Sequence, residues 1–139
     1  MTYKIIYEAG HSSTDTQILY SGLAAYAKKE ADMQPVEPFS YLIHDEKNTL
    51  QGGCLGAICY GSLHIDTLWV DEALRGKGYG IQLMELALEH GRKNNCAFAT
   101  VNTMSWEALE FYKKLGFQVE FERHGFQKNS IFYFLRKNY

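Results

Sequence analysis

The sequence lacks several features that would place the protein in a specialised class. No apolar run approaches the roughly 20 residues of a membrane-spanning helix, and the first residues carry neither a long apolar core nor a small-residue cleavage site. There is also no dense run of lysine or arginine, and the formal net charge is −2 at pH 7. Because nucleic-acid binding normally requires a basic stripe, we expect a cytoplasmic protein with neither nucleic-acid nor membrane partners.

Cysteine is scarce as well. Cys54, Cys59 and Cys96 contain no CxxC pair, and an odd number of thiols cannot all be bridged. The histidines show no metal-ligand spacing. We therefore expect reduced, mostly buried thiols and no metal. A chain of 139 residues can bury a core without such supports, and we expect a single domain over residues 1–139.

The only two prolines, Pro35 and Pro38, lie in one charged connection. Before it, residues 3–7 alternate well enough to predict a first strand, and apolar residues at helical spacing predict one or two helices over about residues 12–31. Gly22 is a candidate break in that helical segment. The prolines favour an extended passage, which either simply faces solvent or forms a recognition loop for a cationic substrate.

The rest of the chain predicts strands and helices in a regular order. Apolar patterning and turn residues predict helices over about residues 79–93 and 105–115 and strands over residues 39–44, 51–60, 62–70, 97–103, 117–122 and 130–136. A helical crossover joins the strands over 62–70 and 97–103, so these two are expected to be parallel. Gly52, Gly53 and Gly56 predict a β-bulge or a close backbone contact.

The most informative stretch joins the strand over 62–70 to the following helix. Gly76, Gly78 and Gly80 alternate there, so the backbone can turn tightly and present N–H groups unobstructed by Cβ atoms. The positive end of the helix dipole and the charges of Arg75 and Lys77 favour an anion such as phosphate beside those groups. The alternative is a glycine-rich turn that only starts a helix.

Spacing separates three kinds of phosphate loop. A Walker A loop would need glycine where Asp71 stands, and serine or threonine where Gly78 stands. A dinucleotide fingerprint would need glycine in place of Ile81 and an acidic residue ending a strand near residue 100. Neither set of requirements is met, which leaves the arginine and glycine pattern of residues 75–80.

That pattern, after a strand ending Leu68-x-Val70, resembles the acetyl-CoA pyrophosphate loop of the GNAT superfamily of N-acetyltransferases. A second motif over residues 105–117, with an alanine, a Phe-Tyr pair and Lys-Leu-Gly-Phe, is similar to the helix-and-strand signature of that family. The motifs lie in the expected order, and the resemblance covers about residues 39–139. It implies an α+β, α/β/α-layered GNAT fold, whose mixed, mostly antiparallel sheet of about six to seven strands is flanked by about four helices.

The resemblance also implies a reaction and a cofactor site. GNAT enzymes transfer acetyl from acetyl-CoA directly to a primary amine, without a covalent enzyme intermediate, and their sheet splays apart beside the strand corresponding to residues 62–70. Main-chain groups there would hold the pantetheine arm and polarise the thioester carbonyl, while the glycine corner would hold the pyrophosphate. The residues implied to bind acetyl-CoA are Leu68, Trp69, Val70, Arg75, Gly76, Lys77, Gly78, Tyr79, Gly80, Asn102, Thr103 and Ser105.

The catalytic groups are also taken from the resemblance. Tyr112 falls where the family often has the tyrosine that protonates the leaving thiolate, and a phenol of pKa about 10 suits that donation. The alternative is a core aromatic beside Phe111. His64 and Asp66, expected on one strand face by the period of two, are candidate bases for the substrate ammonium; a buried histidine and a strand-end carboxylate are the structural alternatives.

Two functions remain open after these motifs. The first is an N-acetyltransferase acting on an amine of a small molecule or peptide; the alternative is a non-catalytic CoA-binding, sensor or dimerisation module of the same fold. The intact glycine corner together with Tyr112 favours the enzyme, because a non-catalytic descendant has no chemical need of the tyrosine. The aromatic C-terminal segment, residues 126–139, predicts a symmetric homodimer. No motif identifies the acceptor amine.

Overall fold

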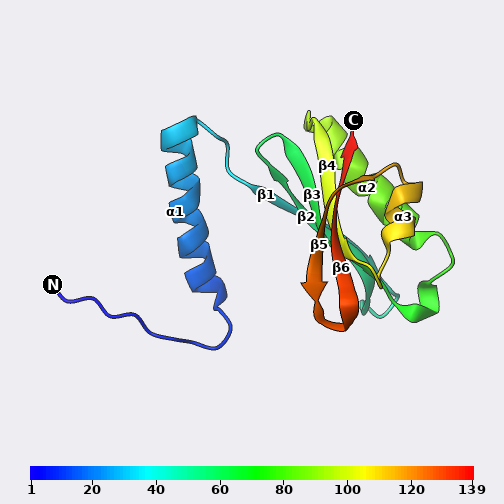
Figure 1. Cartoon of the computed structure of the whole chain (residues 1–139), viewed down its shortest axis with the longest axis horizontal. Helices are drawn as coiled ribbons and strands as arrows, with labels where there is room; N and C mark the ends of the chain where they lie inside the picture. Colours follow the sequence, from blue (N-terminus) through cyan, green and yellow to red (C-terminus); the bar gives the residue numbers. More distant parts are fainter. The chain divides into compact units, whose positions relative to one another are not determined.

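The computed structural model describes residues 1–139, which divide into two compact units, Met1–Pro35 and Val36–Tyr139. Figure 1 shows the elements of both units along the chain. The expectation of a single domain over the whole chain stays a prediction. No helix has both the length and the apolar character that crossing a bilayer requires.

The first unit contains one helix, α1 (Ser13–Ala31). The Ser12 hydroxyl caps it by accepting the Asp15 N–H at 3.0 Å, and Asp32 ends it in the left-handed conformation. Gly22 does not interrupt the helix. The predicted strand over residues 3–7 is wrong: these residues form no strand, because alternation supplies only a propensity and a strand needs a neighbour for its hydrogen bonds.

The second unit is built on a six-stranded sheet of order β1-β2-β3-β4-β6-β5. Only β3 and β4 are parallel, so the predicted mixed and mostly antiparallel sheet is confirmed. The strands are β1 (Glu37–His44), β2 (Leu50–Cys59), β3 (Ser62–Val70), β4 (Phe98–Met104), β5 (Gln118–Phe126) and β6 (Ser130–Asn138).

Two α-helices and two 3-10 helices complete this unit. They are η1 (Glu72–Leu74), α2 (Tyr79–Lys93), α3 (Leu109–Lys114) and η2 (Gln127–Asn129). The α2 helix joins the parallel strands β3 and β4, as its sequence pattern predicts, and it packs Leu83, Met84 and Ala87 into the core. The chain therefore has three α-helices, where the resemblance implied about four.

The α3 helix starts later than predicted, at Leu109 rather than near Ser105. Long-range hydrogen bonds hold the intervening residues in turns. The Ser105 N–H donates to the Ile131 carbonyl at 2.8 Å, and the Thr103 hydroxyl accepts the Ala108 N–H at 3.2 Å. Ile131 is far from Ser105 in the chain, and the bond between Thr103 and Ala108 is not one that a helix makes. The helical spacing of apolar residues therefore could not show that the helix begins late.

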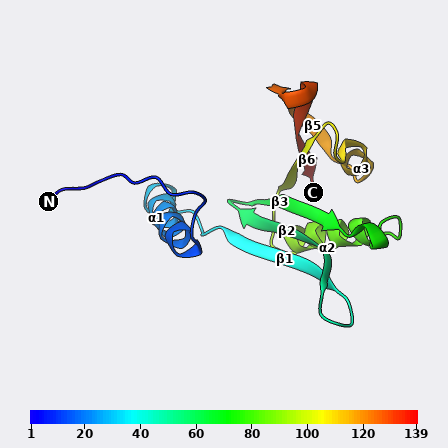
Figure 2. The same cartoon turned by 90° about the horizontal axis from the view of Figure 1, so that it is seen from below.

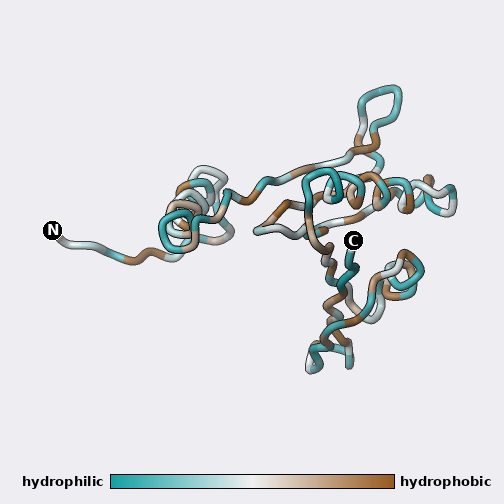
Figure 3. The backbone as a smooth tube through the Cα atoms, turned by 90° about the horizontal axis from the view of Figure 1, so that it is seen from above, coloured by the Kyte–Doolittle hydropathy of each residue, from teal (hydrophilic) through white to brown (hydrophobic).

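Helices α2 and α3 contribute to one buried cluster on one face of the sheet. The other face carries exposed apolar side chains, among them Leu42, Leu55, Trp69 and Phe121. Figure 3 shows apolar stretches alternating with polar ones along the strands, and a hydrophilic turn between β1 and β2. In that turn the Asp45 carboxylate accepts the N–H groups of Lys47 and Thr49 at 2.8 and 2.9 Å, which confirms the predicted hairpin.

Candidate active site

The two parallel strands separate toward their carboxyl ends. They pair only over Ser62–Ile65 of β3 and Phe98–Val101 of β4. Farther along, β3 keeps β2 as its neighbour as far as Val70, while β4 keeps β6 as far as Met104. Figure 2 shows the two groups of strands diverging. The last part of β3 therefore has no strand neighbour on its β4 side, an arrangement in which free main-chain groups can meet a ligand.

A β-bulge in β3 lies at the start of this separation. Leu55 pairs with Thr67 and Gly56 with Ile65, so Asp66 has no partner in β2. A Cβ atom on Gly56 would collide with the His64 carbonyl, which explains the glycine. The bulge predicted from the glycines of β2 is therefore confirmed.

The bulge changes which residues of β3 face the core. Before it, Leu63 and Ile65 are buried; after it, Leu68 and Val70 pack against the core and Trp69 is exposed. The period of two is thus interrupted between the two halves of the strand. Trp69 consequently lies on the face opposite the helices, while the side chains on either side of it support the core.

The two candidate bases have different surroundings. His64 is half-buried, and its Nδ1 atom lies 2.7 Å from the Thr100 hydroxyl of β4. Asp66 is exposed in the bulge and makes no side-chain hydrogen bond within the chain. The sequence placed His64 and Asp66 on one face of the strand because alternate residues of a regular strand share a face. Asp66 lies in the bulge, where this alternation is interrupted, so the rule does not apply to the pair.

The chain turns sharply after β3. The Asp71 N–H donates to the Gln51 carbonyl at 2.7 Å, and the Asp71 carboxylate accepts the Ala73 N–H at 3.0 Å at the start of η1. Gly76 and Gly78 then adopt φ angles of 76° and 86°. L side chains rarely adopt this left-handed region, so glycine at both positions lets η1 lead directly into α2.

The N–H groups from Gly76 to Ile81 have no acceptor in the chain. The first hydrogen bond of α2 runs from the Gln82 N–H to the Gly78 carbonyl at 3.1 Å, and no side chain caps the helix or places an acid in its first turn. These groups and the helix dipole suit an anion. A cavity of about 290 Å³ opens beside them, lined by Val70, Leu74, Arg75, Gly76, Gly78, Tyr79, Gly80, Ile81 and Phe111.

The two cations of this corner differ in position. Arg75 lines the cavity, and its Nε–H donates to the Val70 carbonyl at 2.9 Å, which ties the guanidinium to the end of β3. Lys77 is exposed and does not line the cavity. Arg75 is therefore the better-placed cation for a ligand that spans the strand end and the helix start.

The three candidate cofactor residues after α2 are held in different ways. Asn102 is half-buried, with no side-chain hydrogen bond within the chain. Thr103 is buried, and its hydroxyl is engaged with the Ala108 N–H. The Ser105 hydroxyl accepts the Ile131 N–H at 3.0 Å. Asn102 alone of the three has a side chain whose hydrogen-bonding groups are not used by the protein.

Tyr112 has a buried ring in the aromatic cluster of α3. Its ring centroid lies 5.2 Å from that of Phe111 and 6.0 Å from that of Phe117. Its hydroxyl has no hydrogen-bond partner in the chain, yet no buried side-chain oxygen or nitrogen is unpaired, so the hydroxyl oxygen is not sealed from solvent. Burial raises the pKa of Tyr112 to about 12, with smaller contributions from the charges of Cys54 and Glu107.

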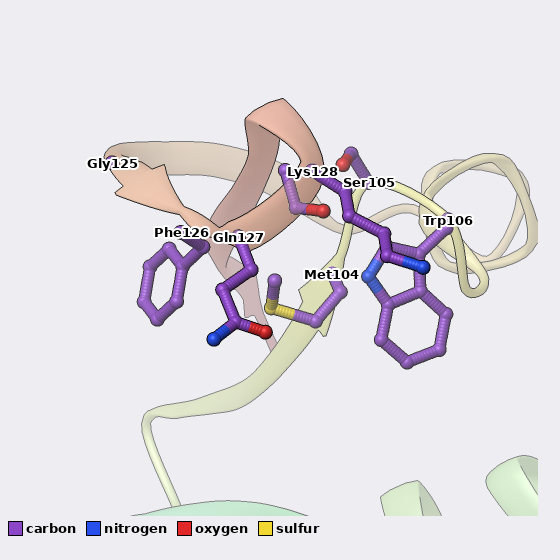
Figure 4. A pocket seen from close by; sticks show the side chains of 8 residues that line it. Met104, Ser105, Trp106, Gly125, Phe126, Gln127 and Lys128 are labelled. Carbon is purple, nitrogen blue, oxygen red and sulfur yellow. The ribbon is translucent and has the colours of Figure 1, made fainter.

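A larger cavity, of about 930 Å³, lies where β4 ends and the β5–β6 hairpin turns. Figure 4 shows its walls, with an indole and a phenyl ring on either side of a thioether. Since β3 and β4 are parallel, this cavity and the glycine corner follow the carboxyl ends of neighbouring strands. The lining residues are Met104, Ser105, Trp106, Gly125, Phe126, Gln127, Lys128 and Ser130.

Comparison with known proteins decides the family. The sequence model of the acetyltransferase (GNAT) family matches residues 10–117. This chain belongs to that family. The GNAT fold predicted from the two motifs is therefore confirmed, and the glycine corner and the diverging strands are parts of a GNAT domain.

Two GNAT relatives match part of the chain. Acetyltransferase Atu2258 of Agrobacterium fabrum is 37% identical over 75 residues, which cover 54% of this chain and 55% of the relative. Blasticidin-S acetyltransferase of Streptomyces morookaense is 32% identical over 89 residues, which cover 63% of this chain and 65% of the relative. The matched segments thus span less than two thirds of either relative.

Solved structures show the same fold. A crystal structure of an Agrobacterium tumefaciens protein has a TM-score of 0.85 and 24% identity, with coverage of 99% of this chain and 100% of that one. A Bacillus anthracis structure in complex with acetyl coenzyme A has a TM-score of 0.66 and 17% identity, with coverage of 74% and 63%.

Several cavity-lining residues were not singled out from the sequence as site residues. Leu74, Ile81 and Phe111 line the corner, and Trp106 and Phe126 line the larger cavity. The pattern held one usable signal. Trp106 follows Ser105 directly within the second motif, and a tryptophan beside a candidate site residue offers a large aromatic surface for a ligand.

Proposed function

We propose that the protein is an acetyl-CoA-dependent N-acetyltransferase, which moves acetyl to a primary amine of a small molecule or peptide by direct attack in a ternary complex. The observation that carries this proposal is the separation of β3 from β4 next to a helix start with unsatisfied N–H groups. Relatives named as acetyltransferases support the same reaction.

The glycine corner has the groups that a pyrophosphate needs. The free N–H groups from Gly76 to Ile81 and the guanidinium of Arg75 would bind it, and Lys77 would contribute at longer range. Leu68, Trp69 and Val70 would meet the pantetheine arm with main-chain groups, and Asn102 would meet it from β4. When bound, acetyl-CoA supplies an acetyl thioester at the opening between these strands.

Tyr112 would serve as the general acid. As the amine nitrogen forms its bond to the carbonyl carbon and the carbon–sulfur bond breaks, the Tyr112 hydroxyl would donate its proton to the sulfur. With its pKa raised to about 12, that hydroxyl carries its proton at neutral pH and for several pH units above it. The proton of the substrate ammonium would go to water, to His64, whose Nδ1 already contacts Thr100, or to Asp66 in the bulge.

The larger cavity is the proposed acceptor site. It lies at the end of β4, and its volume of about 930 Å³ fits a small molecule or a peptide end. Ser105 and Thr103 would then act by shaping this site, because their hydroxyls bind the Ile131 and Ala108 N–H groups.

Thiol release from acetyl-CoA with a panel of primary amines tests this function, alongside calorimetry of acetyl-CoA binding. Amine-dependent thiol release is expected. Binding without release by any amine would support the alternative, a non-catalytic CoA-binding or sensor module. Absence of binding would remove the acetyl-CoA site itself.

A further inference from the structure

The larger cavity has an unusual balance of charge for a site that takes an amine. Its side chains are apolar or neutral apart from Lys128, and no carboxylate lines it. Amines are cations in neutral water, and a site for a polycation normally presents acidic groups to it. The absence of a lining carboxylate makes a polyamine or a similarly polycationic acceptor a poor match.

Lys128 is free to meet a ligand. It forms no ion pair with any of the carboxylates that pair elsewhere in the chain, namely those of Asp32, Glu89, Glu110, Glu120 and Glu122. Its backbone has a φ of 59°, within η2. Figure 4 shows its side chain extending toward Trp106. A free ammonium is thus directed along an aromatic wall.

The nearby carboxylates form no ion pair with this cation. The Glu107 carboxylate accepts the Met104 N–H at 2.8 Å, and Glu122 pairs with His124. Arg123, on β5, adds a second positive charge to the hairpin. Its guanidinium lies 5.4 Å from the Phe134 ring centroid. The two acidic groups are engaged, whereas Lys128 has no partner.

Two hydrogen bonds join the segments that form the cavity around Lys128. The Ser105 N–H donates to the Ile131 carbonyl, and the Ser105 hydroxyl accepts the Ile131 N–H. This pair of bonds joins the chain after β4 to the start of β6. Trp106 and Lys128, which flank these two points, therefore face one cavity from anchored segments rather than from independent loops.

We infer that the acceptor has an aromatic or apolar body and carries an anionic group, such as a carboxylate, that pairs with Lys128. Trp106, Phe126 and Met104 would pack on the body, and the ammonium of Lys128 would form a charge-assisted hydrogen bond with the anion. This inference rests on the proposed function, because it describes the acceptor of the same transfer. A nearby cation also favours the neutral, nucleophilic form of the acceptor amine.

Product analogues test the inference without relying on turnover. N-acetylphenylalanine and N-acetylphenylalaninamide differ in the carboxylate and have no basic amine, so their binding to the CoA-loaded protein can be compared directly by calorimetry. We expect the acid to bind about tenfold or more tightly than the amide. Equal affinities, tighter binding of the amide, or no binding of either at millimolar concentration would overturn the inference.

Two variants assign the preference to Lys128. Lys128→Met replaces the ammonium with an unbranched apolar side chain of similar length at the same left-handed backbone position, and it should bring the two affinities to within about threefold. Lys128→Glu should reverse the order of the two affinities. Lys47→Met, in the turn between β1 and β2, is the matched control and should keep the wild-type ratio. A wild-type ratio in Lys128→Met would contradict the inference.

Failure of the proposed function would look different. If the carboxylate preference depends on Lys128 but phenylalanine and other amines release no thiol from acetyl-CoA, the cavity takes an anionic apolar ligand and the protein is not a transferase. If amines release thiol but spermidine is the best acceptor, the transferase proposal stands and the inferred acceptor class is wrong.

Discussion

Tyr112 combines a buried ring with a hydroxyl that has no hydrogen-bond partner in the chain. A tyrosine used only for packing would be replaceable by phenylalanine at little cost. A tyrosine that protonates a leaving sulfur would not, because the hydroxyl then acts only as the thioester breaks. The two roles therefore differ in rate rather than in stability.

Tyr112→Phe is expected to lower kcat by about 10²–10⁴-fold while leaving the affinity for acetyl-CoA nearly unchanged. Steady-state kinetics and calorimetry measure the two effects. Tyr139→Phe is the matched control: Tyr139 also has a pKa raised to about 12, but its hydroxyl donates to the Leu88 carbonyl at 2.8 Å. The control should lose a little stability and keep its rate. Retention of more than about a third of kcat in Tyr112→Phe would make Tyr112 a packing residue.

The pH profile follows from the same tyrosine. Because burial raises the Tyr112 pKa, the hydroxyl stays protonated above the pH at which a free phenol ionises. It loses its proton, and with it the ability to act as an acid, only as the pH rises through about 12. In the wild type, kcat/KM should rise as the amine or its base deprotonates and should not fall near pH 10. An alkaline fall near pH 10 would point to a different acid, one with the ordinary pKa of a phenol or an ammonium group.

At the scale of elements, the glycine corner carries the proposed cofactor site. Gly78→Val should weaken acetyl-CoA binding by at least about tenfold, or roughly 1.4 kcal/mol, because a side chain there strains the left-handed backbone that presents the N–H groups. Calorimetry on the folded variant measures this.

Gly61→Val is the control for backbone strain alone. Gly61 has a φ of 84°, nearly that of Gly78 at 86°, with open space around its Cβ position and a place in the turn between β2 and β3. It should lose similar stability but keep the wild-type affinity for acetyl-CoA. Equal affinity in folded Gly78→Val and wild type would remove the pyrophosphate assignment.

The elements that sequence could predict are those that local pattern specifies. Strand β3 and helix α2 lie where alternation and helical spacing put them, over Ser62–Val70 and Tyr79–Lys93. The late start of α3 depends on bonds to residues far along the chain, such as Ile131. The absence of a strand over residues 3–7 depends on pairing, which no local pattern encodes.

The candidate site was predictable in a similar way. Glycines and charges of the corner are adjacent in sequence, so a motif captures them. The larger cavity joins Trp106 to the hairpin turn of Lys128, two segments that meet only after β4 and β6 pair. Sequence spacing could therefore not predict its lining. The glycines of β2 predicted a bulge, but its position at Asp66 of β3 depends on the register with β2.

At the scale of the whole molecule, we propose a symmetric homodimer. Aromatic side chains gather on the β5–β6 hairpin, where Phe121 is 54% exposed and lies 5.8 Å, ring to ring, from Phe134. An exposed ring packed on a half-buried one favours an isologous contact through the same hairpin of a second copy.

Light scattering at micromolar concentration should give the mass of a dimer, and Phe121→Arg should give that of a monomer. Leu86→Arg is the control, since Leu86 is similarly exposed, at 51%, but lies on α2. A monomeric wild type would contradict the proposal, and dissociation by Leu86→Arg but not by Phe121→Arg would move the contact to α2.

The bulge in β3 means that the strand carries one residue more than its pairing with β2 needs. Removing Asp66 would leave Ile65 opposite Gly56 and Thr67 opposite Leu55, as they are now, so Leu68 would still face the core. What would be lost is the local bend and extra twist that a bulge gives its strand. Deleting this one exposed residue would therefore spare the core while straightening β3 at the point where it parts from β4.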